Sequence, residues 1–516
     1  MTIIIPARKA PWIRILLAMS AFLLFIPSSR SQYDFNQNCQ QAYQAVLSLK
    51  FSEAQKLISA GKRESPDNLI PVYLENYVDF LTLIIGEEEA VYNQLKSRKN
   101  DRIALLEKGR KDSPYYNYCL GEVYLQWAFA RLKFGDYTTA AFEIHKAYDL
   151  FEANEKKYPE FLINKTGMGV LHVMVSLVPD KYRWVSSLVG LSGSMELGLK
   201  EIRQVAGYTG TDHITRMYRQ EAAFFLAFLA LNVQRNKSQA MQVLGLIKDQ
   251  PGDFPQSQSP LMIFARATVL MKNGFNEEAL SVLQERPSDA QTFSFCYLDY
   301  LEGVARLNKL DNNASGFFDK FISGFRGRNY IRSACQKLAW ISLLHGDSVA
   351  YRKHINLALT KGASVVDEDK QAEHEARQGV PPNIVLLRAR LLFDGGYYDM
   401  AINELLNNSV KIAVKSKRDL LEYTYRLGRI YHESGNLSKA LENYRQTIIR
   451  GKTEPYYFAA SAAYQMGLLY ENKEAYAKAD SAYHLCLTIK SPEYQTSLHQ
   501  KAKAGLNRLK KAIPKT

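Results

Sequence analysis

Two stretches near the C-terminus share one pattern of apolar, small and polar positions. In the first, Leu427 and Tyr431 lie four residues apart, so both project from one face of a helix. Gly428, between them, leaves room for a second helix to approach closely. A Gly-Asn turn follows, and the next stretch places Ala440 and Tyr444 four residues apart. The pattern predicts two antiparallel helices that pack through small residues.

The pattern returns 39 residues later, where Gly467 and Tyr483 take the places of Gly428 and Tyr444. A proline follows each second helix and ends it. The repeated unit resembles the tetratricopeptide repeat (TPR), a helix hairpin of about 34 residues. The resemblance implies that the hairpins stack into a solenoid that binds other chains, because one hairpin cannot bury its apolar face alone.

The chain after residue 31 follows a helical pattern with few strand-like alternations, and about eight hairpins are expected. We predict an all-α fold, a TPR-like right-handed superhelix of antiparallel helix hairpins with a non-repeat helical insert. The predicted parts are a signal peptide (1–31), N-terminal TPR-like hairpins (32–158), an irregular helical insert (159–206), degenerate TPR-like hairpins (207–362), a charged and proline-containing loop (363–383), and C-terminal TPR hairpins with a capping helix (384–516).

The insert at 159–206 is apolar and departs from the repeat. Pro179 can open a helix there, and the glycines at 190 and 193 can turn it. This segment resembles the corresponding segment of the TTC39/Iml2 group of TPR proteins, a family linked to lipid-droplet and organelle functions. The resemblance implies a helical-repeat fold with a non-repeat insert. The acidic run and double proline within 363–383 could bind a cation or a basic partner, or form an exposed helix or loop.

The N-terminus has the pattern of a secretory signal. Basic residues precede an apolar run at 15–26, and Ser29 and Ser31 supply small residues before a cut at Gln32. The run has 12 residues, fewer than the ~20 that span a bilayer. An uncleaved anchor or a core helix is the alternative. We expect cleavage after Ser31, no lipid anchor because the segment lacks cysteine, and a soluble mature chain in a bacterial periplasm or at the cell surface.

The net charge of +14 falls to +10 when the four basic residues of 1–31 are removed. Basic clusters at 96–111 and 501–515 could bind anionic lipid, lipopolysaccharide, nucleic acid or an acidic partner, or form solvated faces. Export argues against nucleic acid. The cysteines form no Cys-x-x-Cys pair, which favours buried free thiols, although an oxidising compartment leaves a disulfide open. They are Cys39, Cys119, Cys296, Cys335 and Cys486.

The sequence contains no specific catalytic motif. Its nine histidines are dispersed, and none forms the pair of a zinc protease. A nucleophile elbow and a phosphate-binding loop are also missing. We therefore expect a protein that is not an enzyme and that holds no cofactor or metal, although distant residues could still converge in space.

The TPR resemblance also implies a binding face. In TPR proteins the first helix of each hairpin lines the concave groove. The residues that this places at a partner or peptide are Glu422, Tyr425, Arg429, His432, Tyr464, Leu468 and Glu471. TPR proteins that clamp a terminal carboxylate use Lys and Asn at such positions, so chaperone-tail binding is not implied. Tyr425 and Tyr464 could instead pack between repeats.

The sequence therefore favours an exported, non-catalytic helical-repeat scaffold or adaptor that binds a protein or peptide segment in the cell envelope. The alternative is an envelope protein that binds glycans or lipids, similar to the TPR-containing SusD-like nutrient receptors. Aromatic residues make up 12% of the chain and could stack on sugars, whereas the missing lipidation cysteine argues against this alternative. Partner identity and oligomeric state stay open.

Overall fold

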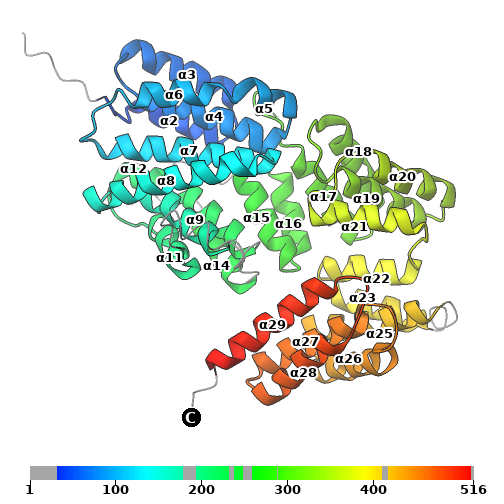
Figure 1. Ribbon diagram of the computed structural model, residues 1–516. Helices are drawn as coiled ribbons and strands as arrows, with labels where there is room; N and C mark the ends of the chain where they lie inside the picture. Colours follow the sequence, from blue (N-terminus) through cyan, green and yellow to red (C-terminus); the bar gives the residue numbers. More distant parts are fainter. Residues whose placement is uncertain are drawn as a thin grey trace, which may run out of the picture.

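The computed structural model describes residues 32–177, 193–231, 237–247, 259–287, 289–409 and 416–512, so the predicted signal peptide lies outside it. Throughout these residues the regular structure is helical, with no β-strand. Successive helices pack as adjacent pairs that wind from one end of the molecule to the other (Figure 1). This confirms the predicted all-α solenoid of helix hairpins. None of the described helices is long and apolar enough to cross a bilayer.

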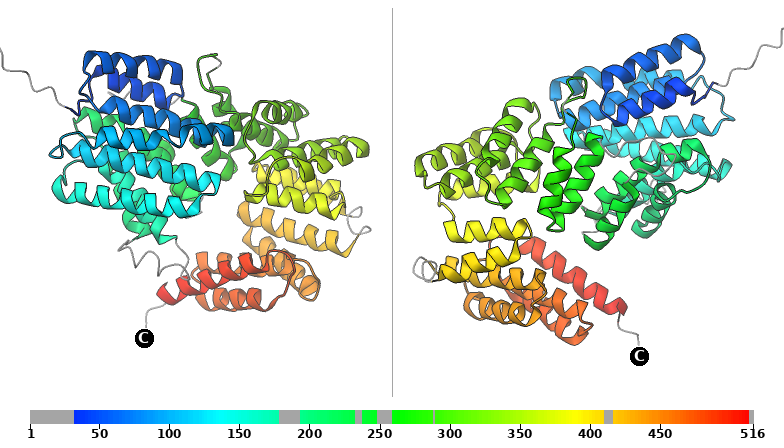
Figure 2. Two further views of the ribbon diagram at one scale, coloured as in Figure 1. Left: turned by 45° about the horizontal axis from the view of Figure 1, so that its top comes forward. Right: turned by 180° about the vertical axis from the view of Figure 1, so that it is seen from behind.

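The N-terminal part contains α2 (Gln37–Leu47), α3 (Phe51–Glu64), α4 (Ile70–Gly86), α5 (Glu89–Leu95), α6 (Arg98–Leu106), α7 (Pro114–Phe134), α8 (Tyr137–Lys157), α9 (Asn164–Ser176), α11 (Met195–Ala206), α12 (His213–Met217), α13 (Arg219–Leu229), α14 (Lys237–Ile247), α15 (Pro260–Lys272) and α16 (Asn276–Gln284). The C-terminal part contains α17 (Tyr297–Asn308), α18 (Ala314–Gly324), α19 (Ile331–Leu344), α20 (Ser348–Thr360), α21 (Asp367–Gln378), α22 (Ile384–Asp394), α23 (Tyr398–Asn407), α25 (Lys417–Glu433), α26 (Leu437–Gly451), α27 (Phe458–Asn472), α28 (Tyr476–Thr488) and α29 (Gln495–Ala512). Figure 2 shows the same succession from two further sides.

One spacing recurs in the hairpins. A buried small residue on the first helix is followed, seven positions later, by a residue with positive φ in the turn. The small residue admits the second helix, and the left-handed residue ends the first one. The pairs are Ala42 and Leu49, Ala128 and Gly135, Ala267 and Gly274, Gly303 and Leu310, Ala339 and Gly346, Ala389 and Gly396, Gly428 and Gly435, and Gly467 and Glu474.

In several hairpins an aromatic ring of the second helix packs on a glycine of the first. A Cβ added to Gly428 of α25 would lie 2.6 Å from Cδ1 of Tyr444 on α26, and Tyr444 is fully buried. Gly467 of α27 receives the Tyr483 ring of α28 in the same way. The glycine predicted from sequence to permit close helix packing therefore does so. The same arrangement joins Gly303 to Phe318 and Gly121 to Phe151.

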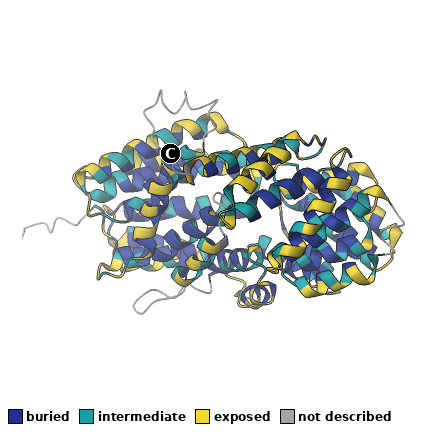
Figure 3. Ribbon diagram, turned by 90° about the horizontal axis from the view of Figure 1, so that it is seen from below, coloured by how far each residue is buried: buried dark blue, intermediate teal, exposed yellow. Residues whose placement is uncertain are grey.

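Three apolar cores follow one another along the chain. The first runs from Tyr33 to Val269, the second from Ile263 to Leu391 and the third from Leu386 to Leu509. Two helices, α15 and α22, contribute residues to two cores each, so the apolar packing passes from core to core without a break. Figure 3 shows buried residues where helices meet and exposed residues on the outer faces. All five cysteines are free thiols.

The described part of the segment 159–206 includes two helices, α9 and α11, that pack closely on each other. Their backbones approach at two glycines, because a Cβ on Gly169 would lie 2.5 Å from the Gly198 carbonyl oxygen. A buried contact between His172 Nδ1 and Glu201 Oε2, at 2.7 Å, joins the same helices. Pro179 lies outside the described residues, as do the glycine at 190 and its surroundings.

A helix, α21, occupies much of 363–383, so the segment follows the helix alternative and not the predicted loop. Helix α21 buries Ala372 and Ala376, four residues apart, and its three acidic residues in the first turn suit a helix N-terminus. The Asp369 carboxylate accepts the backbone N–H groups of Tyr330 at 2.6 Å and Ser333 at 2.9 Å. Burial raises the pKa of Asp369 to about 6. One member of the acidic run therefore caps α19.

We expect Gly428→Ala to lower the free energy of unfolding by about 1 to 3 kcal/mol, because the new methyl group would press on the buried Tyr444 ring. Gly316→Ala is the matched control, since Gly316 lies in α18 with open space where its Cβ would be. That variant should be neutral or more stable by up to ~1 kcal/mol. Urea unfolding compares the two, and equal stabilities would contradict the close-packing account.

Candidate partner-binding cavity

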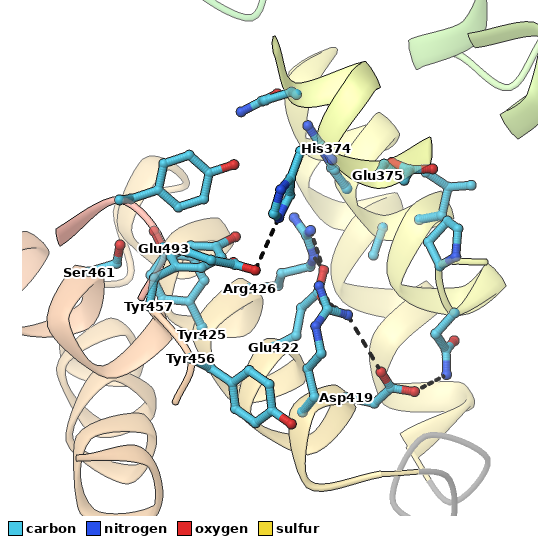
Figure 4. A pocket seen from close by; sticks show the side chains of 18 of the residues that line it. His374, Glu375, Asp419, Glu422, Tyr425, Arg426, Tyr456, Tyr457, Ser461 and Glu493 are labelled. Carbon is cyan, nitrogen blue, oxygen red and sulfur yellow. Dashed lines mark hydrogen bonds and ion pairs between the residues drawn. The ribbon is translucent and has the colours of Figure 1, made fainter. Parts of the chain in front are cut away.

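A cavity of about 1060 Å³ opens on one side of the C-terminal part of the solenoid. Its walls come from α19, α21, α22, α25 and α27, together with residues between Glu493 and Lys501. Four of these helices, α19, α22, α25 and α27, are the first helices of their hairpins, which pair with α20, α23, α26 and α28. Figure 4 shows side chains from several of these elements turned toward one space.

Glu422 of α25 is a buried carboxylate held by arginines. Arg426 Nε donates to Glu422 Oε1 at 2.8 Å, and Arg418 Nη1 lies 3.3 Å from Oε2. Burial alone would raise the pKa of Glu422, but the positive charges of Arg426 and Arg418 outweigh it. The pKa therefore lies below its ordinary value of 4.5, and Glu422 is charged at neutral pH.

The turn after α28 closes one side of the cavity against α21. His374 Nε2 lies 3.2 Å from Glu493 Oε1 (Figure 4). Gln378 Nε2 donates to the same oxygen at 3.2 Å. Tyr494, beside Glu493, packs edge-on against Tyr457 with ring centroids 5.0 Å apart. The two contacts of Glu493 join residues more than a hundred positions apart in the chain, so this side of the cavity depends on how the C-terminal hairpins stack.

The cavity combines an aromatic wall with an apolar rim. Tyr425 and Tyr457 lie with ring centroids 6.4 Å apart, one on α25 and the other just before α27. Val380, Ile384 and Tyr494 line the cavity and are exposed, although all three are apolar or aromatic. Exposed apolar groups beside a cavity are typical of surfaces that bind a partner.

Three of the predicted binding residues, Glu422, Tyr425 and Arg429, line the cavity. The Arg429 guanidinium lies 5.2 Å from the centre of the Phe393 ring, and its Nη2 contacts Glu433 at 3.5 Å. These residues lie on the first helix of their hairpin, where the TPR resemblance placed them.

The other four predicted residues do not line the cavity. His432 Nδ1 contacts the Tyr444 hydroxyl at 3.2 Å within its own hairpin, and Leu468 packs against the third core. Tyr464 and Glu471 face other parts of the last repeat. The Tyr464 ring lies 6.0 Å from that of Tyr483, and Glu471 accepts two hydrogen bonds of 2.7 Å from Arg508 of α29.

Helix α29 explains why Glu471, a predicted binding residue of α27, does not line the cavity. It packs against both α27 and α28, and Gly505 lets it approach the Tyr483 ring closely. Glu471 is therefore paired with the terminal helix. A capping helix is predictable from the sequence, but the side chains that it contacts are not.

Sequence reasoning missed Trp340 and Arg390, which line the cavity from α19 and α22. The sequence does contain a pattern that points to both residues. Arg429 directly follows the small residue Gly428, and Trp340 and Arg390 directly follow Ala339 and Ala389 in the same register. Applying that register to the weaker hairpins would have predicted both. Tyr457 and Glu493 lie outside the register, so no comparable signal pointed to them.

Comparison with known proteins places the chain among TPR proteins. The family model for Iml2/Tetratricopeptide repeat protein 39 matches residues 30–298. The chain belongs to this family. The match is far broader than the segment that carried the TTC39/Iml2 resemblance, and it ends before α19, so the cavity lies in the part that the Iml2/TPR_39 model does not cover. No curated protein matches the chain.

Solved structures with low sequence identity are also similar to this Iml2/TPR_39 chain. The human IFIT1 dimer with PPP-AAAA has 13% identity and a TM-score of 0.34, over 81% of this chain and 95% of that one. The P58(IPK) TPR domain has 12% identity and a TM-score of 0.21, over 75% and 99%. The APC/C hetero-tetramer Cut9-Hcn1 has 11% identity and a TM-score of 0.23, over 95% and 98%.

We expect Glu422→Gln to destabilise the chain by roughly 3 kcal/mol at neutral pH, because Arg426 and Arg418 would lose their buried anion. The loss should shrink as the pH falls below 4.5, since protonation then removes the same charge from the wild type. Glu433→Gln, in a more exposed pair with Arg429, should cost less than ~1 kcal/mol. Unfolding followed at several pH values measures both, and equal losses would contradict the assigned role of Glu422.

Proposed function

We propose that this protein is a non-catalytic scaffold that binds a segment of a partner protein in the cavity between α21, α22, α25 and α27. The helical-repeat fold and the Iml2/TPR_39 family support a role in protein interaction. The cavity, at about 1060 Å³, is at the upper end of ordinary ligand pockets, which hold roughly 300 to 1,000 Å³. It therefore has room for several side chains of a bound segment.

The observation that carries this proposal is the exposed apolar rim beside buried aromatic and charged walls. Val380, Ile384 and Tyr494 would lose water on binding, while Tyr425 and the arginines of the lining supply oriented contacts. Aromatic and arginine side chains are enriched among residues that dominate binding energy at protein interfaces. An extended or helical segment laid along the first helices would meet both kinds of group.

A photo-crosslinking residue at position 380 should capture the partner in living cells. Val380 is 69% exposed on the rim, and Val349 of α20, at 78%, is an equally exposed control away from the cavity. We expect a defined crosslinked product from position 380 and none from 349, with loss of the product when Ile384→Glu is added. Equal products from both positions, or a product that survives Ile384→Glu, would count against the cavity.

A glycan ligand is the second candidate, and the tyrosine rings of the cavity favour it, because sugars stack on aromatic faces. Tyr425, Tyr457 and Tyr494 all line the space. A rise in melting temperature with soluble envelope glycans, together with no crosslinked protein at position 380, would favour the glycan, since a ligand that binds only the folded chain stabilises it.

We further propose that the chain acts in a bacterial cell envelope after export, on the strength of the signal-like segment at 1–31. Protein purified from the envelope fraction should begin at Gln32 when its N-terminus is sequenced. A chain that keeps residues 1–31 and fractionates with the cytosol would contradict export.

A further inference from the structure

Arg390 lacks the close carboxylate contact that Arg418 and Arg426 of the same cavity have with Glu422. The side chain lines the cavity from α22, and its nearest carboxylate oxygen is Asp394 Oδ2, at 3.7 Å from Nε. None of its N–H groups donates a hydrogen bond to a described residue. Arg426, by contrast, donates two to Glu422. Guanidinium groups form strong, planar pairs with carboxylates, so Arg390 presents an open position for one.

A second cation lies on the same indole ring as Arg390. The Arg390 guanidinium carbon is 4.9 Å from the centre of the Trp340 ring, and Lys337 Nζ is 3.8 Å from it. Lys337 donates to the neutral Gln336 Oε1 at 2.9 Å, and no described carboxylate forms an ion pair with it. Lys337 has no described ion-pair partner, and Arg390 has only the contact with Asp394 at 3.7 Å, so the combined field of the two cations attracts a further anion.

Four of the five carboxylates that line the cavity accept hydrogen bonds from this chain, and the fifth, Asp394, lies against Arg390. Glu375 accepts Trp340 Nε1 at 2.8 Å and Gln336 Nε2 at 2.7 Å. Glu422 is held by arginines, Glu493 by His374 and Gln378, and Asp419 accepts Asn383 Nδ2 at 3.0 Å. The hydrogen-bond donors of Arg390 therefore stay available to a carboxylate that approaches more closely than Asp394 does. The five carboxylates of the lining would at the same time repel a polyanion such as a nucleic acid.

We propose that the cavity contains a subsite for one carboxylate of the bound segment, which pairs with Arg390 against Trp340, with Lys337 supporting the pair. The carboxylate is an Asp or Glu side chain or a chain terminus, and an apolar side chain beside it meets the rim at Val380 and Ile384. This inference rests on the proposed function and specifies the chemistry of the partner.

Lys337 gives the subsite a pH dependence near neutrality. Burial and the positive charge of Arg390 lower its pKa to about 7, and the acidic groups that face it, Glu375 and Glu368 of α21 and Asp394 of α22, offset this only in part. A bound carboxylate favours the charged ammonium and therefore raises this pKa. Affinity should be highest below pH 7 and should fall as Lys337 loses its proton above that value.

The test uses the mature chain labelled with 5-fluorotryptophan, because Trp340 reports directly on the subsite. The Trp340→Phe variant assigns its ¹⁹F signal. The probes are end-capped heptapeptides of Gly, Ser and Leu with one central Glu or Gln. A third probe is the Gln peptide with a free C-terminal carboxylate, which separates a terminal from a side-chain source. Dissociation constants come from the shift of the Trp340 signal at pH 6.0 and 8.5.

We expect the Glu peptide to bind about tenfold more tightly than the capped Gln peptide at pH 6.0. At pH 8.5 the Glu peptide should bind more weakly than it does at pH 6.0. Arg390→Gln should abolish the preference, and Arg390→Lys should keep part of it. The control Arg388→Gln should keep all of it, because Arg388 lies on the same helix but contacts Glu404 outside the cavity lining. Lys337→Met should remove the pH dependence, whereas His374→Gln should not.

A preference shown only by the free-terminus probe would support the subsite and assign the carboxylate to a chain end. Equal affinity for Glu and capped Gln peptides, a Glu preference that survives Arg390→Gln, or no saturable shift with any carboxylate probe would overturn the proposal. Capture of a partner at position 380 despite such a result would leave the scaffold function in place and reject only the carboxylate subsite.

Discussion

The close approach of the two helices in each hairpin is the constraint on which the rest of the molecule depends. A glycine or alanine on the first helix removes the side chain that would hold the helices apart, and a buried ring of the second helix often fills the space, as Tyr444 does at Gly428. The left-handed residue seven positions later ends the first helix at a constant distance from this contact. Each hairpin therefore presents its first helix in the same register to the next hairpin.

That register produces the cavity. The residue after the small position lies on the same side of each first helix, so Trp340, Arg390 and Arg429 line one space from three successive hairpins. Trp340 belongs to the second apolar core at the same time, so this wall of the cavity is continuous with that core. The turn that carries Glu493 then reaches α21 and closes the remaining side. Successive hairpins differ slightly in sequence, and their stacking therefore brings charged and apolar side chains together on one surface.

The all-α fold could be predicted from the sequence, because the spacing of Leu427, Gly428 and Tyr431 is that of a helix packed against a second helix. The sequence also placed Glu422, Tyr425 and Arg429 on the first helix of a hairpin, where the structure has them in the cavity lining.

Other features depend on distances that a local pattern does not contain. The contact of His374 with Glu493 joins positions 119 residues apart, and the pairing of Arg508 with Glu471 requires the angle at which α29 crosses the last hairpin. The acidic run at the start of α21 is compatible with a loop or an exposed helix, because its polarity conceals two alanines that pack inward. In these cases tertiary contacts determine the structure, and the local sequence alone does not predict it.

The most direct test of the account is amide hydrogen exchange of the full chain, alone and with the partner that co-purifies with it. The account predicts slower exchange on binding in α21, α22, α25 and residues 493–501, which surround the cavity, and no change in the second helices α20, α23 and α26. Protection confined to those second helices, or to the N-terminal part before α15, would contradict the claim that this cavity is the site where the scaffold binds its partner.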